Sequence, residues 1–199
     1  METIERQFEP AEHPDYPICY SCRTYKPHRA KHCPFDQHCV DTYDHFCMWT
    51  GNTIGGNNHR LFYLTLSLET ILLWIMTFGS IIAFIFYPKW LGVPDGTFLE
   101  TFKNVADSMW WFYPVYLVML LITCFVTITF AQQTKYILNN ILMNEFINAS
   151  RYSDVTILPN GQRHTKYNTN SKKRNFKLFI TGERRIKYAK QNIEVVLDE

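Results

Sequence analysis

Two long apolar runs dominate the pattern of hydrophobic and polar positions along the chain. The first extends from Leu61 to Tyr87 and the second from Trp110 to Ala131, and neither contains Lys or Arg. Each run is long enough to cross a hydrocarbon core of about 30 Å as a helix. Buried core helices of a soluble domain are the alternative, but runs of this length without a basic residue are uncommon there. We therefore predict membrane-spanning helices at 61–87 and 110–134.

The polar segments around these runs differ in their basic residues. The loop at 88–109 holds only Lys89 and Lys103, while the segments before the first run and after the second hold the other Lys and Arg. Basic segments remain on the cytosolic side of a membrane. We therefore predict cytosolic termini, a non-cytosolic loop at 88–109 and a basic cytosolic tail at 135–199. The N-terminus has neither a basic start nor an apolar stretch, so no cleavable secretion signal is expected.

Weaker patterns follow the second run. Apolar residues at helical spacing predict that 132–152 continues as an amphipathic cytosolic helix. Beyond it, a Pro159-Asn160-Gly161 turn separates two short apolar groups, Val155 to Leu158 and Phe176 to Ile180, which predict a small strand pair. The basic residues of the tail lack a stacking platform or recognition helix. We expect them to form a solvated surface near anionic lipid headgroups and to bind no nucleic acid.

A polar lead-in at 1–18 precedes a stretch at 19–60 that is rich in Cys and His. This stretch shows no sustained period of 3.6 or 2, which is typical of a small module held by metal ligation. Five of the six cysteines lie between Cys19 and Cys47. Because this side is predicted to be cytosolic and reducing, metal binding and catalysis are favoured over disulfides. The sixth, Cys124, is predicted to be a small buried thiol in the second span.

A chelating knuckle, Cys19-x2-Cys22, opens this module. His32 and Cys39 follow at close range and complete a Cys3His set, whose thiolates and neutral imidazole match zinc in softness and tetrahedral geometry. Cysteines scattered in a loop do not account for this combination in a segment with so little apolar material. The sequence therefore predicts a structural zinc site at these four residues.

The metal positions belong to a longer series of residues. It comprises Cys19-x2-Cys22, Lys26-Pro27, Arg29, His32-Cys33, Cys39, Asp44-His45-Phe46-Cys47, Trp49, Asn58 and Phe62, followed after the second span by Asn144-Glu145, Asn148-Ala149 and Arg151-Tyr152. In order and spacing this series resembles the Asp-His-His-Cys (DHHC) palmitoyltransferases, with Phe46 in place of the second His. The stretch from Gly56 to Arg60 is similar to the ankyrin-repeat branch of that family.

The resemblance implies an α-helical integral membrane protein in which a small zinc-stabilised cysteine-rich module is followed by two transmembrane helices and a cytosolic tail. It implies a protein S-acyltransferase that moves a long-chain acyl group from acyl-CoA to Cys47 and then to a cysteine of a client protein. Because a free thiol is mostly protonated at neutral pH, His45 is expected to act as base and Asp44 to orient its imidazole. On the residues alone, a Cys and a His two positions apart would be a weak indication of catalysis.

The resemblance also implies a second zinc ion, and this chain departs from the family there. The four positions fall on Cys33, Asp36, Phe46 and Thr53, so one residue of the type suited to structural zinc survives. We therefore predict one zinc ion per chain, with Phe46 filling the space of a ligand histidine.

Members of the family normally have two further spans before the module. The chain is thus expected to be a shortened gene product, an excerpt of a longer protein, or a subunit completed by another chain. A catalytically inactive membrane adaptor is the alternative function, and a zinc-finger regulator of nucleic acid is disfavoured by the two spans. Retention of Asp44, His45 and Cys47 together favours the enzyme. By analogy with the family, we expect the protein in the Golgi or endoplasmic reticulum.

Overall fold

The structure is a computed structural model. It describes residues 16–90, 96–97, 99–100, 103–104, 107 and 110–182, apart from the side chains of 84–85 and 87–90. Most of the predicted lead-in, most of the predicted loop at 88–109 and the tail beyond 182 therefore lie outside the described residues. The chain forms two compact units, one made of Tyr63–Gln132 and the other of the segments on either side of it.

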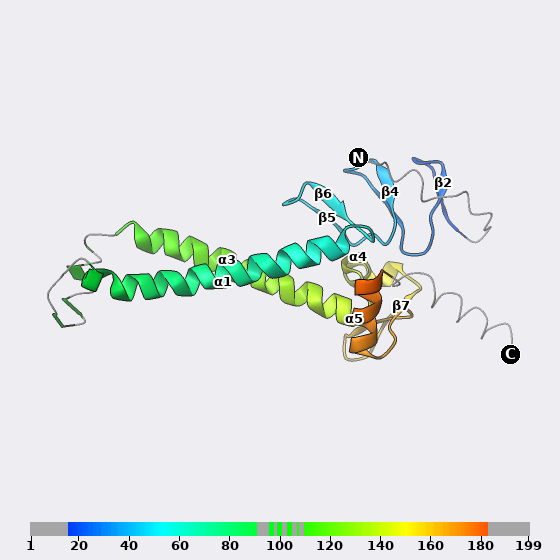
Figure 1. The fold of residues 1–199 in the computed structure, drawn as a ribbon. Coiled ribbons are helices and arrows are strands. Elements are labelled where there is room, and N and C mark those ends of the chain that lie inside the picture. Colours follow the sequence, from blue (N-terminus) through cyan, green and yellow to red (C-terminus); the bar gives the residue numbers. More distant parts are fainter. Residues whose placement is uncertain are drawn as a thin grey trace. The chain divides into compact units, whose positions relative to one another are not determined.

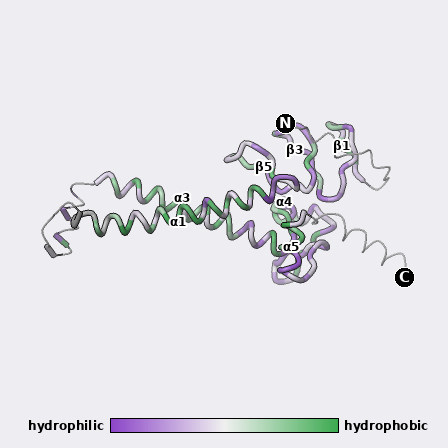
Figure 2. The backbone as a smooth tube through the Cα atoms, viewed as in Figure 1, coloured by the Kyte–Doolittle hydropathy of each residue, from purple (hydrophilic) through white to green (hydrophobic). Residues whose placement is uncertain are grey.

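The unit Tyr63–Gln132 is a hairpin of two long helices, α1 (His59–Trp90) and α3 (Phe112–Leu138), drawn in Figure 1. Figure 2 shows that hydrophobic residues predominate along both. Trp74 Nε1 donates to Thr127 Oγ1 at 3.0 Å, and the hydroxyl oxygens of Thr77 and Thr123 lie 3.2 Å apart. The two helices are therefore antiparallel neighbours.

Both helices are long and apolar enough to cross a membrane, over His59–Ala83 and Phe112–Leu138. With a rise of about 1.5 Å per residue, even the shorter one exceeds the roughly 30 Å of a hydrocarbon core. Only 17% and 11% of their most apolar windows are buried within the chain. A core helix of a soluble protein would be mostly buried, so the structure favours the predicted spans over that alternative.

Polar side chains in the hairpin are satisfied locally. The hydroxyls of Thr70, Thr77, Thr123 and Thr127 each donate to the backbone carbonyl four residues earlier, at 2.6–2.8 Å. Such bonds remove the cost of unpaired hydroxyls in an apolar environment. Cys124, in contrast, is exposed on this unit. The predicted buried thiol is therefore wrong: the neighbouring Thr123 contacts α1, whereas the side chain of Cys124 is exposed.

Three short antiparallel hairpins form the cysteine-rich module of the other unit. They are β1 (Ile18–Cys19) with β2 (Thr24–Tyr25), β3 (Lys31–Cys33) with β4 (His38–Val40), and β5 (His45–Cys47) with β6 (Asn52–Ile54). Isolated two-stranded hairpins are marginally stable in water. The module therefore needs further stabilising contacts, and hydrogen bonds with the C-terminal segment supply some of them.

Helix α3 ends at Leu138, so the predicted continuous helix over 132–152 is wrong. The chain turns at Asn140, which has a φ of 47°, and resumes as the short helix α4 (Met143–Ile147) and the 3-10 helix η2 (Ala149–Arg151). Asn tolerates this left-handed conformation better than most residues. Asn140 Nδ2 also donates to the Tyr167 carbonyl at 2.7 Å, a tertiary contact that helical periodicity does not reveal.

The predicted strand pair in the tail exists with a different partner. Strand β7 (Val155–Ile157) pairs with β8 (Arg163–Thr165), whereas the predicted partner, Phe176–Ile180, lies in helix α5 (Lys172–Thr181). Ser171 caps this helix by accepting a hydrogen bond from the Arg174 N–H, and Gly182 ends it with a φ of 75°. These caps outweigh the β-propensity of the short apolar group.

Candidate functional site

Four side chains converge in the module as the sequence predicts. Cys19 and Cys22 come from the first hairpin, and His32 and Cys39 are cross-strand partners in β3 and β4. Their ligand atoms all lie within 4.8 Å of one another, with Cys22 Sγ 3.2 Å from His32 Nδ1. A tetrahedral zinc ion with bonds of about 2.0–2.3 Å requires ligand atoms at such separations. These four residues therefore fit a structural metal ion.

The four positions of the family's second zinc form a different kind of contact. Thr53 Oγ1 donates to Cys33 Sγ at 3.0 Å, and the Thr53 N–H donates to Asp36 Oδ2 at 3.2 Å. Phe46 stacks on Phe35 with ring centroids 4.4 Å apart and packs against the buried Cys33. Hydrogen bonds and aromatic packing thus join the strands here, and the residues do not fit a tetrahedral zinc site.

The three predicted catalytic residues lie together at the start of the third hairpin. Asp44 immediately precedes β5, while His45 and Cys47 are two residues apart and therefore point to the same face of that strand. His45 Nδ1 lies 2.9 Å from Asp44 Oδ2. Phe62 packs edge-on against the His45 ring at a centroid distance of 5.3 Å. The imidazole is thus held between a carboxylate and a thiol.

The environment favours the charged forms of His45 and Cys47. Burial alone would raise the pKa of Cys47, but hydrogen bonds to its sulfur from Thr50, His45 and the Trp49 N–H outweigh burial and lower that pKa. Burial would lower the pKa of His45, but the hydrogen bond and charge of Asp44, together with Cys47, raise it. A thiolate beside an imidazolium is the reactive form of a cysteine nucleophile.

Asp44 is completely buried, and its oxygens receive donors from several elements. Besides His45, the Met143 N–H donates to Oδ1 at 2.8 Å and Gln133 Nε2 donates to Oδ2 at 3.1 Å, while His59 Nε2 lies 3.9 Å away. Burial would raise the pKa of Asp44, but the charges of His59 and His45 and these hydrogen bonds hold it well below its usual range. Asp44 is therefore a carboxylate at neutral pH.

Sequence reasoning missed three of these partners, Gln133, His59 and Met143. Met143 acts through its backbone, so its side chain carries no signal. Gln133 and His59 are polar residues at the ends of apolar helices, and polar residues are common where a membrane-spanning helix ends. Their burial, at 3% and 2% exposure, is the feature that pattern alone does not contain.

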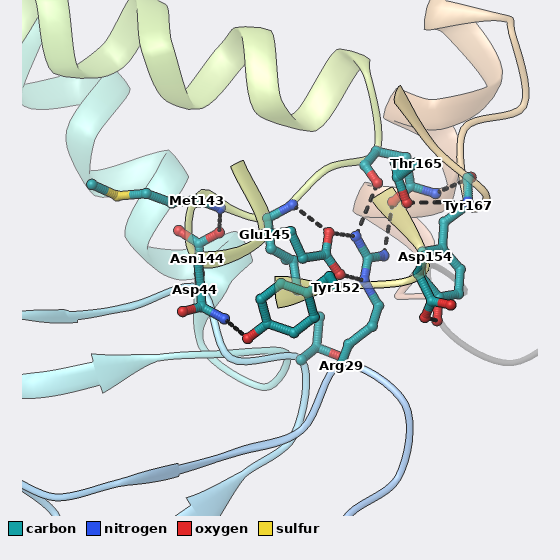
Figure 3. A network of polar contacts seen from close by, with 12 residues as sticks. Arg29, Asp44, Met143, Asn144, Glu145, Tyr152, Asp154, Thr165 and Tyr167 are labelled. Atoms are coloured by element: carbon teal, nitrogen blue, oxygen red, sulfur yellow. Dashed lines mark hydrogen bonds and ion pairs between the residues drawn. The ribbon is translucent and has the colours of Figure 1, made fainter. Parts of the chain in front are cut away.

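A buried ion pair joins the module to the C-terminal segment (Figure 3). Arg29 Nε and Nη2 donate to the two carboxylate oxygens of Glu145, each at 2.6 Å, and Nη2 also donates to the Asn140 carbonyl at 2.9 Å. The Arg29 guanidinium stacks over the Tyr167 ring at 4.2 Å. Glu145 in turn accepts the N–H of Leu142 at 2.9 Å. This network fixes the segment that carries the Met143 N–H against Asp44.

Comparison with known proteins supports the resemblance. A family model described as DHHC palmitoyltransferase matches residues 12–150. Palmitoyltransferase ZDHHC9 of Danio rerio is 37% identical over 92 residues, covering 46% of this chain and 22% of that protein. For palmitoyltransferase ZDHHC9 of Homo sapiens the identity is 36% over 92 residues, with 46% and 24% covered. Palmitoyltransferase ZDHHC14 of Danio rerio is 44% identical over 61 residues, covering 30% and 12%.

The fold and site define a membrane protein in which Asp44, His45 and Cys47 lie together on a cysteine-rich module whose Cys/His cluster could hold a metal ion. The chain belongs to the DHHC palmitoyltransferase family. The match spans about a quarter of the length of the ZDHHC9 relatives. These matches do not test the similarity to the ankyrin-repeat branch, which stays a prediction.

Proposed function

We propose that the protein is a protein S-acyltransferase that uses Cys47 as its nucleophile. The observation that carries this proposal is the position of His45, which is hydrogen-bonded to Asp44 and also contacts Cys47. The family of the chain supports the same function. If Cys47 had only a structural role, it would need no neighbouring base. An inactive adaptor would likewise need no thiolate at this position. The arrangement therefore supports an enzyme over an inactive adaptor.

In the first step, the Cys47 proton moves to His45 and the Cys47 thiolate attacks the carbonyl carbon of a long-chain acyl-CoA. The new C–S bond forms as the bond to the CoA sulfur breaks, and the CoA thiolate leaves with the proton from His45. In the second step, a client cysteine gives its proton to His45 and its thiolate attacks the acyl-enzyme. Cys47 leaves as a thiolate and regains the proton.

Both steps exchange one thioester for another, so little net driving force is needed. Catalysis then depends on forming the thiolate and on holding the acyl carbon beside Cys47. We expect the acyl donor to partition into the membrane and the clients to present membrane-proximal cysteines. With cytosolic termini, the module meets both substrates on the cytosolic side of Golgi or endoplasmic reticulum membranes.

We further propose one structural zinc ion per chain, held by Cys19, Cys22, His32 and Cys39. The close approach of their ligand atoms supports this site. Zinc would cross-link the first two hairpins, which bury little apolar surface of their own. The third hairpin, which carries Cys47, would instead rely on the Phe46 packing and the Thr53 hydrogen bonds. No step of the proposed reaction involves the metal.

Autoacylation tests the proposed function. The protein is expressed in its source cells, so that any partner is present. Membranes isolated from these cells are then incubated with a clickable palmitoyl-CoA. We expect hydroxylamine-sensitive label on the wild type, no label on Cys47→Ser and strongly reduced label on His45→Ala. Cys124→Ser is the matched control, because it removes an exposed thiol outside the site, and it should label like the wild type.

Absence of label on folded, zinc-loaded wild-type protein would contradict the enzyme and support the adaptor. Label that persists in Cys47→Ser and disappears in Cys124→Ser would also contradict it, because Cys124 would then be a client site for another acyltransferase.

A further inference from the structure

Two side chains outside the Asp-His-Phe-Cys motif, Gln133 and His59, approach the catalytic carboxylate. Gln133 Nε2 donates to Asp44 Oδ2 at 3.1 Å, the same oxygen that lies 2.9 Å from His45 Nδ1. His59 Nε2 lies 3.1 Å from Gln133 Oε1. Asp44, Gln133 and His59 are each at most 3% exposed. Water therefore has little access to replace any of these contacts.

The chemistry of a carboxylate fixes the direction of this hydrogen-bond chain. An ionised carboxylate only accepts hydrogen bonds, so Gln133 turns its NH2 group to Asp44 and its carbonyl oxygen to His59. A carbonyl oxygen also only accepts, so His59 carries a proton on Nε2. By the same rule His45 carries a proton on Nδ1, so its Nε2 is the atom that can exchange a proton with the Cys47 sulfur.

Aromatic side chains hold His59 in place. Its ring packs edge-on against Phe179 of α5 at a centroid distance of 5.2 Å, and it lies tilted to Phe62 at 6.4 Å. His59 comes from the first turn of α1 and Gln133 from the last turns of α3. Segments far apart in the sequence thus meet behind Asp44.

We propose that Gln133, oriented by His59, is a positioning residue that sets the rotamer of Asp44 and so keeps His45 aimed at Cys47. Without the amide donor, Asp44 Oδ2 would lose the hydrogen bond from Gln133 that helps to hold it beside His45 Nδ1. The imidazole would then be free to rotate or to change tautomer, and either change weakens its support of the Cys47 thiolate. The inference rests on the proposed function and deepens it.

A purely structural role is the competing hypothesis, because buried amides and imidazoles need partners wherever they occur. Both hypotheses predict some loss of stability when Gln133 is replaced. Only the positioning role predicts a change in the protonation of Cys47. Among the described residues, Tyr43 and Tyr136 also lie close enough to Asp44 for its charge to raise their pKa values. Tyrosines stay neutral up to about pH 10, so the histidines dominate near neutrality.

The decisive experiment uses Gln133→Met in the full chain, with Gln132→Met as the matched control. Met keeps the length of the side chain and removes its donor, and Gln132 is the exposed neighbour on the same helix. The pH dependence of Cys47 alkylation by iodoacetamide is followed by peptide mass spectrometry. In parallel, the rate of Cys47 labelling by palmitoyl-CoA is measured.

For Gln133→Met we expect the midpoint of alkylation to move to higher pH and the acylation rate to fall roughly 10- to 100-fold, the effect of losing one hydrogen bond to a charged group. Gln132→Met should match the wild type in both. Metal content and thermal unfolding establish that each variant is folded. Gln133→Leu also removes the donor and adds no charge beside Asp44, so it should show the same shift and decides the matter if Gln133→Met does not fold.

An unchanged alkylation midpoint in folded Gln133→Met or Gln133→Leu would overturn the proposal and leave Gln133 a structural role. Alkylation requires no acyl-CoA. A wild type that is alkylated as a thiolate but never acylated would therefore refute the proposed function, while the midpoint shift would still decide the positioning role.

Discussion

At the scale of single residues, the charge state of Cys47 decides whether the site is reactive. A thiol buried among apolar groups is a poor nucleophile, since burial raises its pKa. Here the sulfur accepts hydrogen bonds from Thr50, His45 and the backbone, and the pKa is lowered in spite of burial. Because the pKa of His45 is raised, the two groups are mutually stabilised as thiolate and imidazolium.

This pairing predicts the pH dependence of alkylation. Because hydrogen bonds to the sulfur lower the pKa of Cys47, the midpoint of its alkylation by iodoacetamide should lie below the ordinary cysteine midpoint of about 8.5. In His45→Ala the hydrogen bond is lost while burial remains, so the midpoint should rise. His164→Ala, at a partly buried histidine of the tail that bonds to Asn170, is the control and should leave the curve in place. Identical midpoints in His45→Ala and wild type would refute the pairing.

A second prediction concerns Gly55, between β6 and α1. A Cβ at this position would lie 2.5 Å from Val40 Cγ1 and 2.9 Å from the Asp41 carbonyl oxygen. The Gly55 N–H and carbonyl also bond to Asn58 and His59, so the backbone has little room to move. Gly55→Ala should destabilise the module by about 1–3 kcal/mol, the usual cost of overpacking.

Thermal unfolding in detergent, followed by a thiol-reactive dye that reports exposure of the buried cysteines, measures this effect. Gly79→Ala is the matched control, because nothing lies within 4 Å of a Cβ there. We expect the Tm of Gly55→Ala to be lower than that of the wild type and the Tm of Gly79→Ala to equal it. Equal Tm values for Gly55→Ala and wild type would show that the close contact is absent.

At the scale of elements, the Arg29–Glu145 ion pair links the connection between β2 and β3 to helix α4. Its side chains are 2% and 4% exposed, so neither charge has water as a substitute partner. Removing one member of a buried pair leaves an uncompensated charge and typically costs about 3–5 kcal/mol, whereas removing both is far milder.

A double-mutant cycle tests this link. Arg29→Met and Glu145→Met should each lower the Tm strongly, and the combined variant should lose less than the sum of the two. Lys173→Met, at an exposed position of α5, should leave the Tm unchanged. Strictly additive losses in the cycle would mean that the two charges do not support each other.

Pattern alone predicted some elements well and others poorly, for identifiable reasons. The spans follow from apolar runs whose length and lack of basic residues are rare in soluble cores, and both occur as helices. The helix predicted over 132–152 fails at Asn140, where tertiary hydrogen bonds stabilise a turn. The strand predicted at Phe176–Ile180 fails because the deciding residues are the caps, Ser171 and Gly182, outside the apolar group.

The candidate site shows the same division. Spacing brought together Cys19, Cys22, His32 and Cys39, because cross-strand pairing and a short knuckle are local features. Gln133, however, is 89 residues from Asp44 in the sequence, and no local pattern reports that the end of α3 returns to the module. Long-range contacts of this kind require the fold.

At the scale of the whole molecule, the single zinc ion proposed for this chain differs from the two-zinc arrangement that its resemblance to the family implied. The Phe35–Phe46 stack and the Thr53–Cys33 hydrogen bond stand where that second ion would bind. Elemental analysis of purified protein should therefore give one equivalent of zinc. Cys19→Ser should lose it, while Cys33→Ser should retain it. Two equivalents in the wild type would refute the one-zinc proposal.

The two apolar helices predict behaviour in the membrane. Their exposed faces offer apolar surface that only lipid or other apolar helices can cover. The protein should therefore remain in the membrane pellet after high salt and alkaline carbonate and should dissolve in detergent. Release by carbonate would contradict integral insertion.

The central claim is that this chain itself forms an acyl-enzyme at Cys47. The most direct test is peptide mapping of the purified, zinc-loaded protein after incubation with palmitoyl-CoA, when no other acyltransferase is present. We predict one hydroxylamine-sensitive acyl group on the peptide that contains Cys47, formed at a much lower rate in His45→Ala. Acylation confined to other cysteines, or none at all, would contradict the claim.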